Sequence, residues 1–230
     1  MLHPAFQGRT LDGTNSKENV AKFLSGGHIL DSEGFIFGPN AFPSPIPENL
    51  TQPAIKPELI ILHSNAGPTY SKWQALIAFI KRADVDKDFH FDVDLDGKAA
   101  QAISIFRRAD CNYKANRFLK NGKWCGAISF ETADKGYPTL ENTEWNFAQL
   151  ETLIGFSFLF CAACSISCQA CPSPYSSGID YHSKFKEWSN VTGKTCPGAA
   201  RIRQMDYVRT EVAKRLAEYY RQCGGSCPGT

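Results

Sequence analysis

Several polar residues that could perform chemistry together lie at or just beyond the ends of predicted elements. His63 ends the apolar stretch ELIILH, Glu131 lies near the end of GAISFET, and a later segment contains His182, Lys194 and Cys196. Two imidazoles and one thiolate form a set that binds catalytic zinc, with a fourth position left for water. These residue types therefore predict a metal centre formed by His63, His182 and Cys196.

The two remaining residues could supply what hydrolysis at such a centre needs. Zinc lowers the pKa of a bound water to about 7 and polarises a substrate carbonyl. Glu131 is the carboxylate predicted to take the proton of the water and pass it to the departing amine. Lys194, two residues before a metal ligand, is predicted to lie beside the developing oxyanion. A histidine at a strand end is more often structural, so the residues alone leave that alternative open for His63.

The elements that must position these residues can be read from hydrophobic periodicity and turn signals. Apolar runs of strand length alternate with helical patterns, and Asp96-Gly97 between two alternating runs indicates a hairpin. This order predicts an α/β fold, a mixed central β-sheet flanked by helices. The predicted elements are a strand at 58–63, a helix at 70–81, hairpin strands at 89–95 and 98–104, a strand at 126–132, and helices from 143 to about 165 and from about 200 to 221.

The rest of the chain carries weaker signals. Residues 1–56 are rich in Gly, Pro and Asn and predict an N-terminal extension that packs on or precedes the core, rather than a separate domain. The catalytic domain is predicted at 57–222 and a C-terminal tail at 223–230. Residues 172–200 are rich in Pro, Ser and Gly and are predicted to form a loop.

Composition and charge exclude several classes of partner. The net charge of +2, from 25 Lys and Arg against 23 Asp and Glu, is too small to indicate a nucleic-acid partner. The apolar run 153–164 is shorter than the roughly 20 residues of a membrane-spanning helix, so we expect a buried core helix and no membrane insertion. The N-terminal segment MLHPAFQGRTLDGTNSKENV has no signal-peptide pattern, so we expect synthesis in the cytoplasm. A monomer is expected.

Two further motifs are set aside as structural. Asp92 to Gly97 copies the start of a calcium loop, but Ile103 stands at the twelfth position, where a bidentate glutamate is required. The nine cysteines include two C-x-x-C pairs in CAACSISCQAC, separated by far fewer residues than in a zinc ribbon. The first pair continues an apolar helix and is predicted to be buried. An odd number of cysteines leaves at least one thiol free, metal-bound or intermolecular.

Five motifs in order carry a resemblance to a known family. ILHSNAGP, FHFDVDLDGKAAQ, GAISFETAD, GIDYHSKF and GKTCPGAARI, spanning roughly residues 58–210, resemble the type 2 amidases, which include phage lysozyme-like amidases and peptidoglycan recognition proteins. The resemblance implies the type 2 amidase (peptidoglycan recognition protein-like) fold and zinc ligands at His63, His182 and Cys196. It also implies that Lys194 stabilises the oxyanion and that Glu131 is the catalytic acid/base.

The sequence departs from the family pattern in two places. Phe89 precedes His90-Phe91 where the family often has a tyrosine, which favours Glu131 as the base. After Arg107-Arg108, many relatives carry an Ala-His pair that lines the groove, whereas this chain has Ala109-Asp110-Cys111-Asn112. The candidate substrate-binding residues are Asn65, Asn112, Tyr181 and Trp188.

The resemblance implies a function on the bacterial cell wall. It predicts a zinc-dependent N-acetylmuramoyl-L-alanine amidase of the phage-endolysin kind, which cuts peptidoglycan between N-acetylmuramic acid and the L-alanine of the stem peptide. Such a protein is made in the host cytoplasm and acts at the wall after release. Two alternatives are a non-catalytic peptidoglycan-binding module and a cysteine hydrolase with Cys196 as nucleophile and His182 as base.

Overall fold

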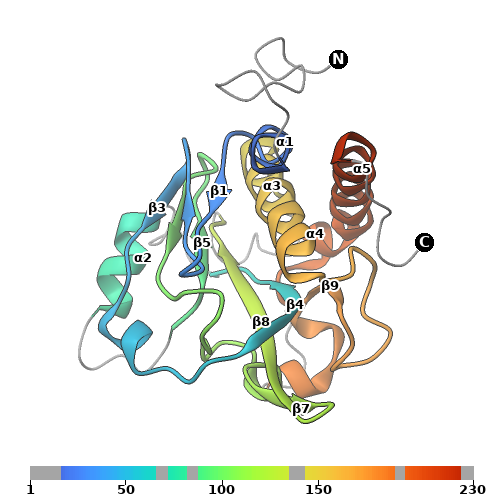
Figure 1. Cartoon of the computed structure of the whole chain (residues 1–230). Coiled ribbons are helices and arrows are strands. Elements are labelled where there is room, and N and C mark those ends of the chain that lie inside the picture. The colour runs from blue at the N-terminus through green and yellow to red at the C-terminus, as the bar shows by residue number, and fades with distance from the viewer. Residues whose placement is uncertain (1–16, 66–71, 82–87, 135–142, 190–194, 224–230) are drawn as a thin grey trace.

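A seven-stranded mixed sheet forms the centre of the protein (Figure 1). The computed structural model describes residues 17–65, 72–81, 88–134, 143–189 and 195–223. The strand order is β3-β6-β5-β8-β4-β9, with β7 paired antiparallel to β8, and β1 and β2 form a separate antiparallel pair. The strands are β1 (Ile29–Leu30), β2 (Ile36–Phe37), β3 (Ala41–Pro43), β4 (Lys56–Leu62), β5 (Phe91–Val93), β6 (Ala99–Gln101), β7 (Phe118–Lys120), β8 (Lys123–Thr132) and β9 (Gly178–Tyr181).

Two long helices, α3 and α5, lie side by side on one face of the sheet, and α1 packs against both (Figure 1). The shorter helix α2 contacts the β5–β6 hairpin. The helices are α1 (Lys17–Leu24), α2 (Trp73–Ile80), α3 (Phe147–Cys164), α4 (Ala199–Arg203) and α5 (Met205–Cys223), and the 3-10 turns are η2 (Pro47–Leu50), η4 (Tyr113–Ala115), η6 (His182–Lys184) and η7 (Lys186–Trp188).

Alternation along the central strands separates two apolar clusters. Ile60 and Leu62 of β4, with Phe130 of β8, belong to the cluster that includes α3 and α5. Leu59 and Ile61 belong to a second cluster that includes Trp188. Because successive side chains of a strand point to opposite faces, the residue after Phe130 and the residue after Leu62 are directed away from α3 and α5.

Helix α3 is a core helix with a defined start. The side chain of Asn146 accepts a hydrogen bond from the backbone N–H of Gln149, and the side-chain oxygen of Gln149 accepts one from the Asn146 N–H, which forms a capping box. Its length and composition would suffice to cross a membrane, but most of its apolar stretch is buried inside the protein. A helix that is apolar all round is expected in a core, so the prediction of a buried helix here is confirmed.

The β5–β6 hairpin closes through a turn that requires glycine. Carboxylate oxygen Oδ1 of Asp94 accepts hydrogen bonds from the N–H groups of Asp96 and Lys98 at 2.9 and 3.0 Å. Gly97 has φ +75°, and a Cβ there would lie 2.5 Å from the carbonyl oxygen of Ala148 in α3. The hairpin prediction is therefore confirmed, and the turn packs directly on the first turn of α3.

Sequence-based prediction of the elements is confirmed for the strands at β4 and β8, the β5–β6 hairpin, and the helices α2 and α3. The loop predicted at 172–200 is wrong in part, because Gly178–Tyr181 forms β9 and pairs parallel with β4. The final helix is interrupted at Gln204, which separates α4 from α5. Within the predicted N-terminal extension, β3 pairs with β6 and is therefore part of the central sheet.

Alanine substitutions at Gly97 and Gly122 test how much the close packing of the β5–β6 turn on α3 restricts residue 97. Gly122 has nearly the same φ, +73°, but a Cβ there would meet nothing within 4 Å. Gly122→Ala should lower the free energy of unfolding by about 1 kcal/mol, the cost of a left-handed backbone alone. Gly97→Ala should lower it by about 3 kcal/mol, because the clash with α3 adds to that cost. Urea unfolding of both variants measures the difference, and equal losses would contradict this account.

Candidate metal centre

Parallel pairing on both sides of β4 brings the chemical residues to one edge of the sheet. Leu62 at the end of β4 is level with Phe130 of β8 and with Tyr181 of β9. The next residues along the three strands are His63, Glu131 and His182. The backbone N–H of His63 continues the ladder by donating to the carbonyl of Phe130 at 2.8 Å. These three side chains therefore meet on the face opposite α3 and α5.

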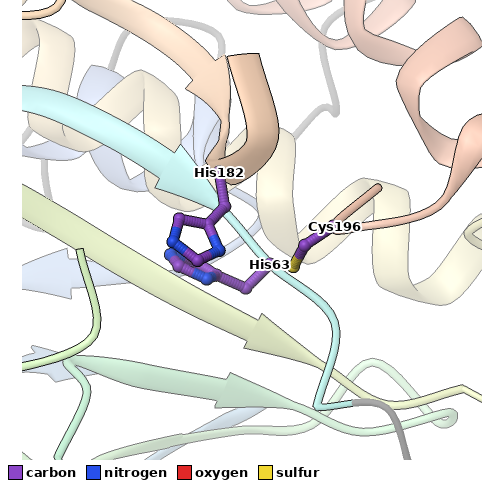
Figure 2. Close-up of side chains that lie close together, drawn as sticks. All are labelled: His63, His182 and Cys196. Atoms are coloured by element: carbon purple, nitrogen blue, oxygen red, sulfur yellow. The ribbon is translucent and has the colours of Figure 1, made fainter. Parts of the chain in front are cut away.

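The three predicted metal ligands converge (Figure 2). One ligand atom from each of His63, His182 and Cys196 lies within 4.8 Å of the other two, and all three residues are buried. The two imidazole rings lie with their centroids 4.2 Å apart. Ligands at 2.0–2.3 Å from a tetrahedral zinc ion are about 3.5 Å from each other, so small side-chain movements would bring these three atoms to zinc-binding distances.

The hydrogen bonds of the two histidines leave the same nitrogen of each ring for a metal. Nε2 of His182 donates to the carbonyl oxygen of Trp188 at 2.6 Å, an oxygen that can only accept. Nε2 of His63 lies 2.6 Å from Oδ1 of Asn112. With the proton on Nε2 in both rings, Nδ1 carries the lone pair. Such outer partners fix the tautomer and orientation of metal-binding histidines.

Cys196 is held by the backbone next to both histidines. The N–H of Ser64, the residue after His63, donates to the Cys196 sulfur at 3.3 Å. The N–H and hydroxyl of Ser183, the residue after His182, both donate to the Cys196 carbonyl, at 3.0 and 2.9 Å. A donor aimed at sulfur suits a thiolate, so the nitrogen, nitrogen and sulfur set fits a zinc ion.

Glu131 lies beside this set with its carboxylate toward His63. Its Oε1 is 3.7 Å from Nδ1 of His63, and its side chain is 16% exposed against 2% for His63. Asp92 is level with Glu131 on the neighbouring strand β5 and is fully buried. Burial, together with the negative charge of Glu131, raises the pKa of Asp92 well above its ordinary value. Glu131 is thus the more solvent-accessible carboxyl group of this pair.

A buried histidine fastens the segment that carries Asn112. Burial lowers the pKa of His90 to about 4, so its ring is neutral. Its Nε2–H donates to the carbonyl of Arg107 at 2.9 Å, and its Nδ1 accepts from the N–H of Ser129 in β8 at 3.1 Å. This tie between β8 and the chain after β6 sets the position of the residues that follow Arg107.

A buried arginine, Arg201, forms hydrogen bonds to the end of β8 next to the site. Its fully buried guanidinium donates to the hydroxyl of Thr132 at 2.9 Å and to the carbonyl of Ala133 at 2.7 Å. The Thr132 hydroxyl in turn donates to the carbonyl of His63. Burial lowers the pKa of Arg201 to about 10, and the charges of Asp134 and Cys196 act in the opposite direction. Arg201 therefore joins the end of β8 to the backbone of a candidate ligand.

The predicted substrate-binding residues occupy different places. Asn112 and Trp188 are fully buried. Asn112 contacts His63 and Trp188 contacts His182, so each is a buried neighbour of a candidate ligand rather than a surface residue. Tyr181 packs against the cluster that includes α3 and α5. Asn65 is half-buried, and its side chain donates to Asp92 at 3.4 Å. Lys194 lies outside the described residues.

Sequence reasoning missed several supporting residues. Arg201 lies inside the quoted motif GKTCPGAARI, and an arginine in an otherwise apolar start of a helix was the available signal. The Ser64 N–H and the Trp188 carbonyl are backbone groups, so side-chain identity carries no signal for them. Cys111, which lies with His63 and Glu131 in a second group of possible ligands, was noted only as part of a departure from the family pattern.

Solved structures provide the comparison that decides the fold. The chain is similar to the catalytic domain of XlyA, with 19% sequence identity and a TM-score of 0.52 over 76% of this chain and 99% of that one. It is also similar to the Staphylococcus aureus hydrolase AmiA in complex with its ligand, with 12% identity and a TM-score of 0.53 over 83% of this chain and 88% of that one. The chain has the type 2 amidase fold.

No family model matches this type 2 amidase-like chain, and no curated protein matches its sequence. At such low identity the likeness concerns the fold, whose mixed sheet and covering helices agree with the α/β prediction.

Removal of Arg201 tests the support behind the site. Arg201→Leu should lower the free energy of unfolding by about 3 kcal/mol or more, because buried oxygen atoms of Thr132 and Ala133 lose their charged donor. Thermal and urea unfolding measure this loss. Arg221→Leu is the matched control, since Arg221 is exposed and paired only with Glu218 among the described residues, and its stability should stay within error of the wild type.

Removal of Asn112 tests the orientation of His63. Asn112→Ala should weaken zinc binding about 10- to 100-fold, because the ring of His63 loses the acceptor that fixes its tautomer. Competition with a chromophoric chelator measures the affinity. Asn146→Ala, which removes the cap of α3, should lower stability by about 1 kcal/mol and leave zinc affinity unchanged. A similar loss of affinity in both variants would point to general destabilisation.

Proposed function

We propose that this protein is a zinc-dependent N-acetylmuramoyl-L-alanine amidase of the endolysin kind. It hydrolyses the amide bond between N-acetylmuramic acid and the L-alanine of the stem peptide in bacterial peptidoglycan. The observation that carries the proposal is the convergence of His63, His182 and Cys196 with Glu131 beside them. The type 2 amidase fold and the order of the five motifs support it.

His63, His182 and Cys196 would hold the zinc ion, and Glu131 would transfer protons. Bound zinc supplies Lewis-acid chemistry, since it acidifies water and polarises a carbonyl. Glu131 accepts a proton at its carboxylate and returns it to the amine that leaves, and its partial exposure gives it access to water and substrate. The Nε2–H groups of His63 and His182 are directed at protein oxygen atoms, so Nδ1 is the nitrogen of each ring that would bind the metal.

A cation is needed where negative charge develops on the carbonyl oxygen, and Lys194 is proposed for this role on its match to the family motif. Arg201 cannot replace it. Its guanidinium is fully buried and already donates to oxygen atoms of Thr132, Ala133 and Thr143. The proposed partner is bacterial peptidoglycan, and the proposed route is synthesis in the host cytoplasm followed by action at the wall as a monomer.

The two alternative functions make different demands on the same residues. A non-catalytic binding module needs no base, whereas Glu131 lies 3.7 Å from a candidate ligand with part of its side chain open to solvent. A cysteine hydrolase needs Cys196 as an accessible nucleophile, but that side chain is 1% exposed and its sulfur accepts a backbone N–H. Both observations favour the zinc amidase.

Metal content and stem-peptide release test the proposal together. Purified protein should contain about one zinc per chain by elemental analysis. A chelator should abolish release of stem peptides from purified cell wall, and added zinc should restore it. Glu131→Gln should keep the zinc and lower the rate about 10²- to 10⁴-fold, because only the proton transfer is lost. His63→Ala should lose the zinc.

Glu151→Gln, on the exposed side of α3, is the control and should keep wild-type activity. A protein that pulls down cell wall but releases nothing would be a binding module. Activity that survives chelation but is lost on alkylation would identify a cysteine hydrolase. Either outcome would overturn the zinc amidase.

A further inference from the structure

A second group of possible metal ligands overlaps the first. One ligand atom from each of His63, Cys111 and Glu131 lies within 4.8 Å of the other two. His63 belongs to both groups. The other two members are His182 and Cys196 in the first group, and Cys111 and Glu131 in the second. Imidazole, thiolate and carboxylate are all zinc ligands, so the residue types suit the same ion.

Cys111 is held toward this point by its surroundings. The segment that carries it is tied to β8 by His90, and the side-chain amide of the next residue, Asn112, lies 3.5 Å from the Cys111 sulfur. That same amide bonds His63 through its oxygen at 2.6 Å. One side chain therefore fixes the relative positions of the thiol and the imidazole.

The surroundings of the second group are rich in acidic side chains. The negative charges of Glu131, Asp88 and Asp110 all act on the Cys111 thiol. Arg108 offsets part of this charge by pairing with Asp110 at 2.7 Å. A divalent ion between Cys111 and Glu131 would offset more of it.

We propose that His63, Cys111 and Glu131 form a second position for the metal ion, exclusive of the first because both use His63. The inference rests on the proposed function, since it concerns the same ion. Occupation of the second position releases the thiol proton of Cys111 to solvent and turns Glu131 into a ligand. A carboxylate bound to the ion cannot act as the base, so this form of the protein is inactive.

Cobalt spectroscopy of single and double variants tests the second position, because Co²⁺ bound to a thiolate gives a sulfur-to-metal charge-transfer band. Metal-free Cys196→Ser loses the thiolate of the first group. It should still bind Co²⁺ with that band, now from Cys111. Cys196→Ser/Cys111→Ser should lose the band and bind Co²⁺ about 100-fold more weakly than Cys196→Ser. Cys196→Ser/Cys164→Ser is the matched control, since Cys164 is a half-buried thiol on α3 outside both groups, and it should keep the band.

Two results would overturn the second position: absence of the band in folded Cys196→Ser, or its persistence when Cys111 is also replaced. Circular dichroism checks folding, and Cys196→Ala serves for the same measurement if the serine variant does not fold. Failure of the proposed function is a separate result, because it appears as Cys111→Ser protein, which keeps only the first position, that holds zinc and releases no stem peptide. Hydrolysis by the wild type without a band in Cys196→Ser would instead reject the second position alone.

Discussion

The parallel pairing of β4 with both β8 and β9 is the constraint on which the candidate site depends. It brings Leu62, Phe130 and Tyr181 level across three strands, so that the residue after each, His63, Glu131 and His182, is placed on one face although the three are far apart along the chain. The opposite face is filled by apolar side chains against α3 and α5. A shift of one residue in either pairing would exchange these faces and bury a leucine where a ligand stands.

The sequence predicted the parts of the site that strand ends and residue types reveal. His63 and Glu131 lie at the edge where apolar strands end, and the motif around Cys196 places a thiol near them. Strand β9 was not predicted because only four residues, Gly178–Tyr181, carry it inside a segment of loop composition, and its stability comes from pairing with β4. The positions of Asn112 and Trp188 behind the histidines depend on contacts across distant segments, which no local pattern encodes.

The site also shows how polar groups are kept inside a mostly apolar protein. Each candidate ligand forms a hydrogen bond with a neighbour: His63 with Asn112, His182 with the carbonyl of Trp188, and Cys196 with the N–H of Ser64. The buried guanidinium of Arg201 donates to oxygen atoms of Thr132 and Ala133, which limits the cost of its burial. The resulting network leaves little freedom for the rings to turn, and such preorganisation is what a precise metal centre requires.

The strand β3 has a consequence for how this protein can be shortened. It covers the outer edge of β6, and the sheet is extended there by the Ser44 N–H, which donates to the carbonyl of Gln101 at 2.8 Å. The side chain of Gln101 also bonds the backbone at Ile36 and Gly34. A fragment begun at residue 57 to isolate the ligand-bearing strands would strip this cover and leave β6 as an open template for aggregation. Strand β3 thus protects the edge of the sheet, and a protein shortened from the N-terminal side would aggregate more readily.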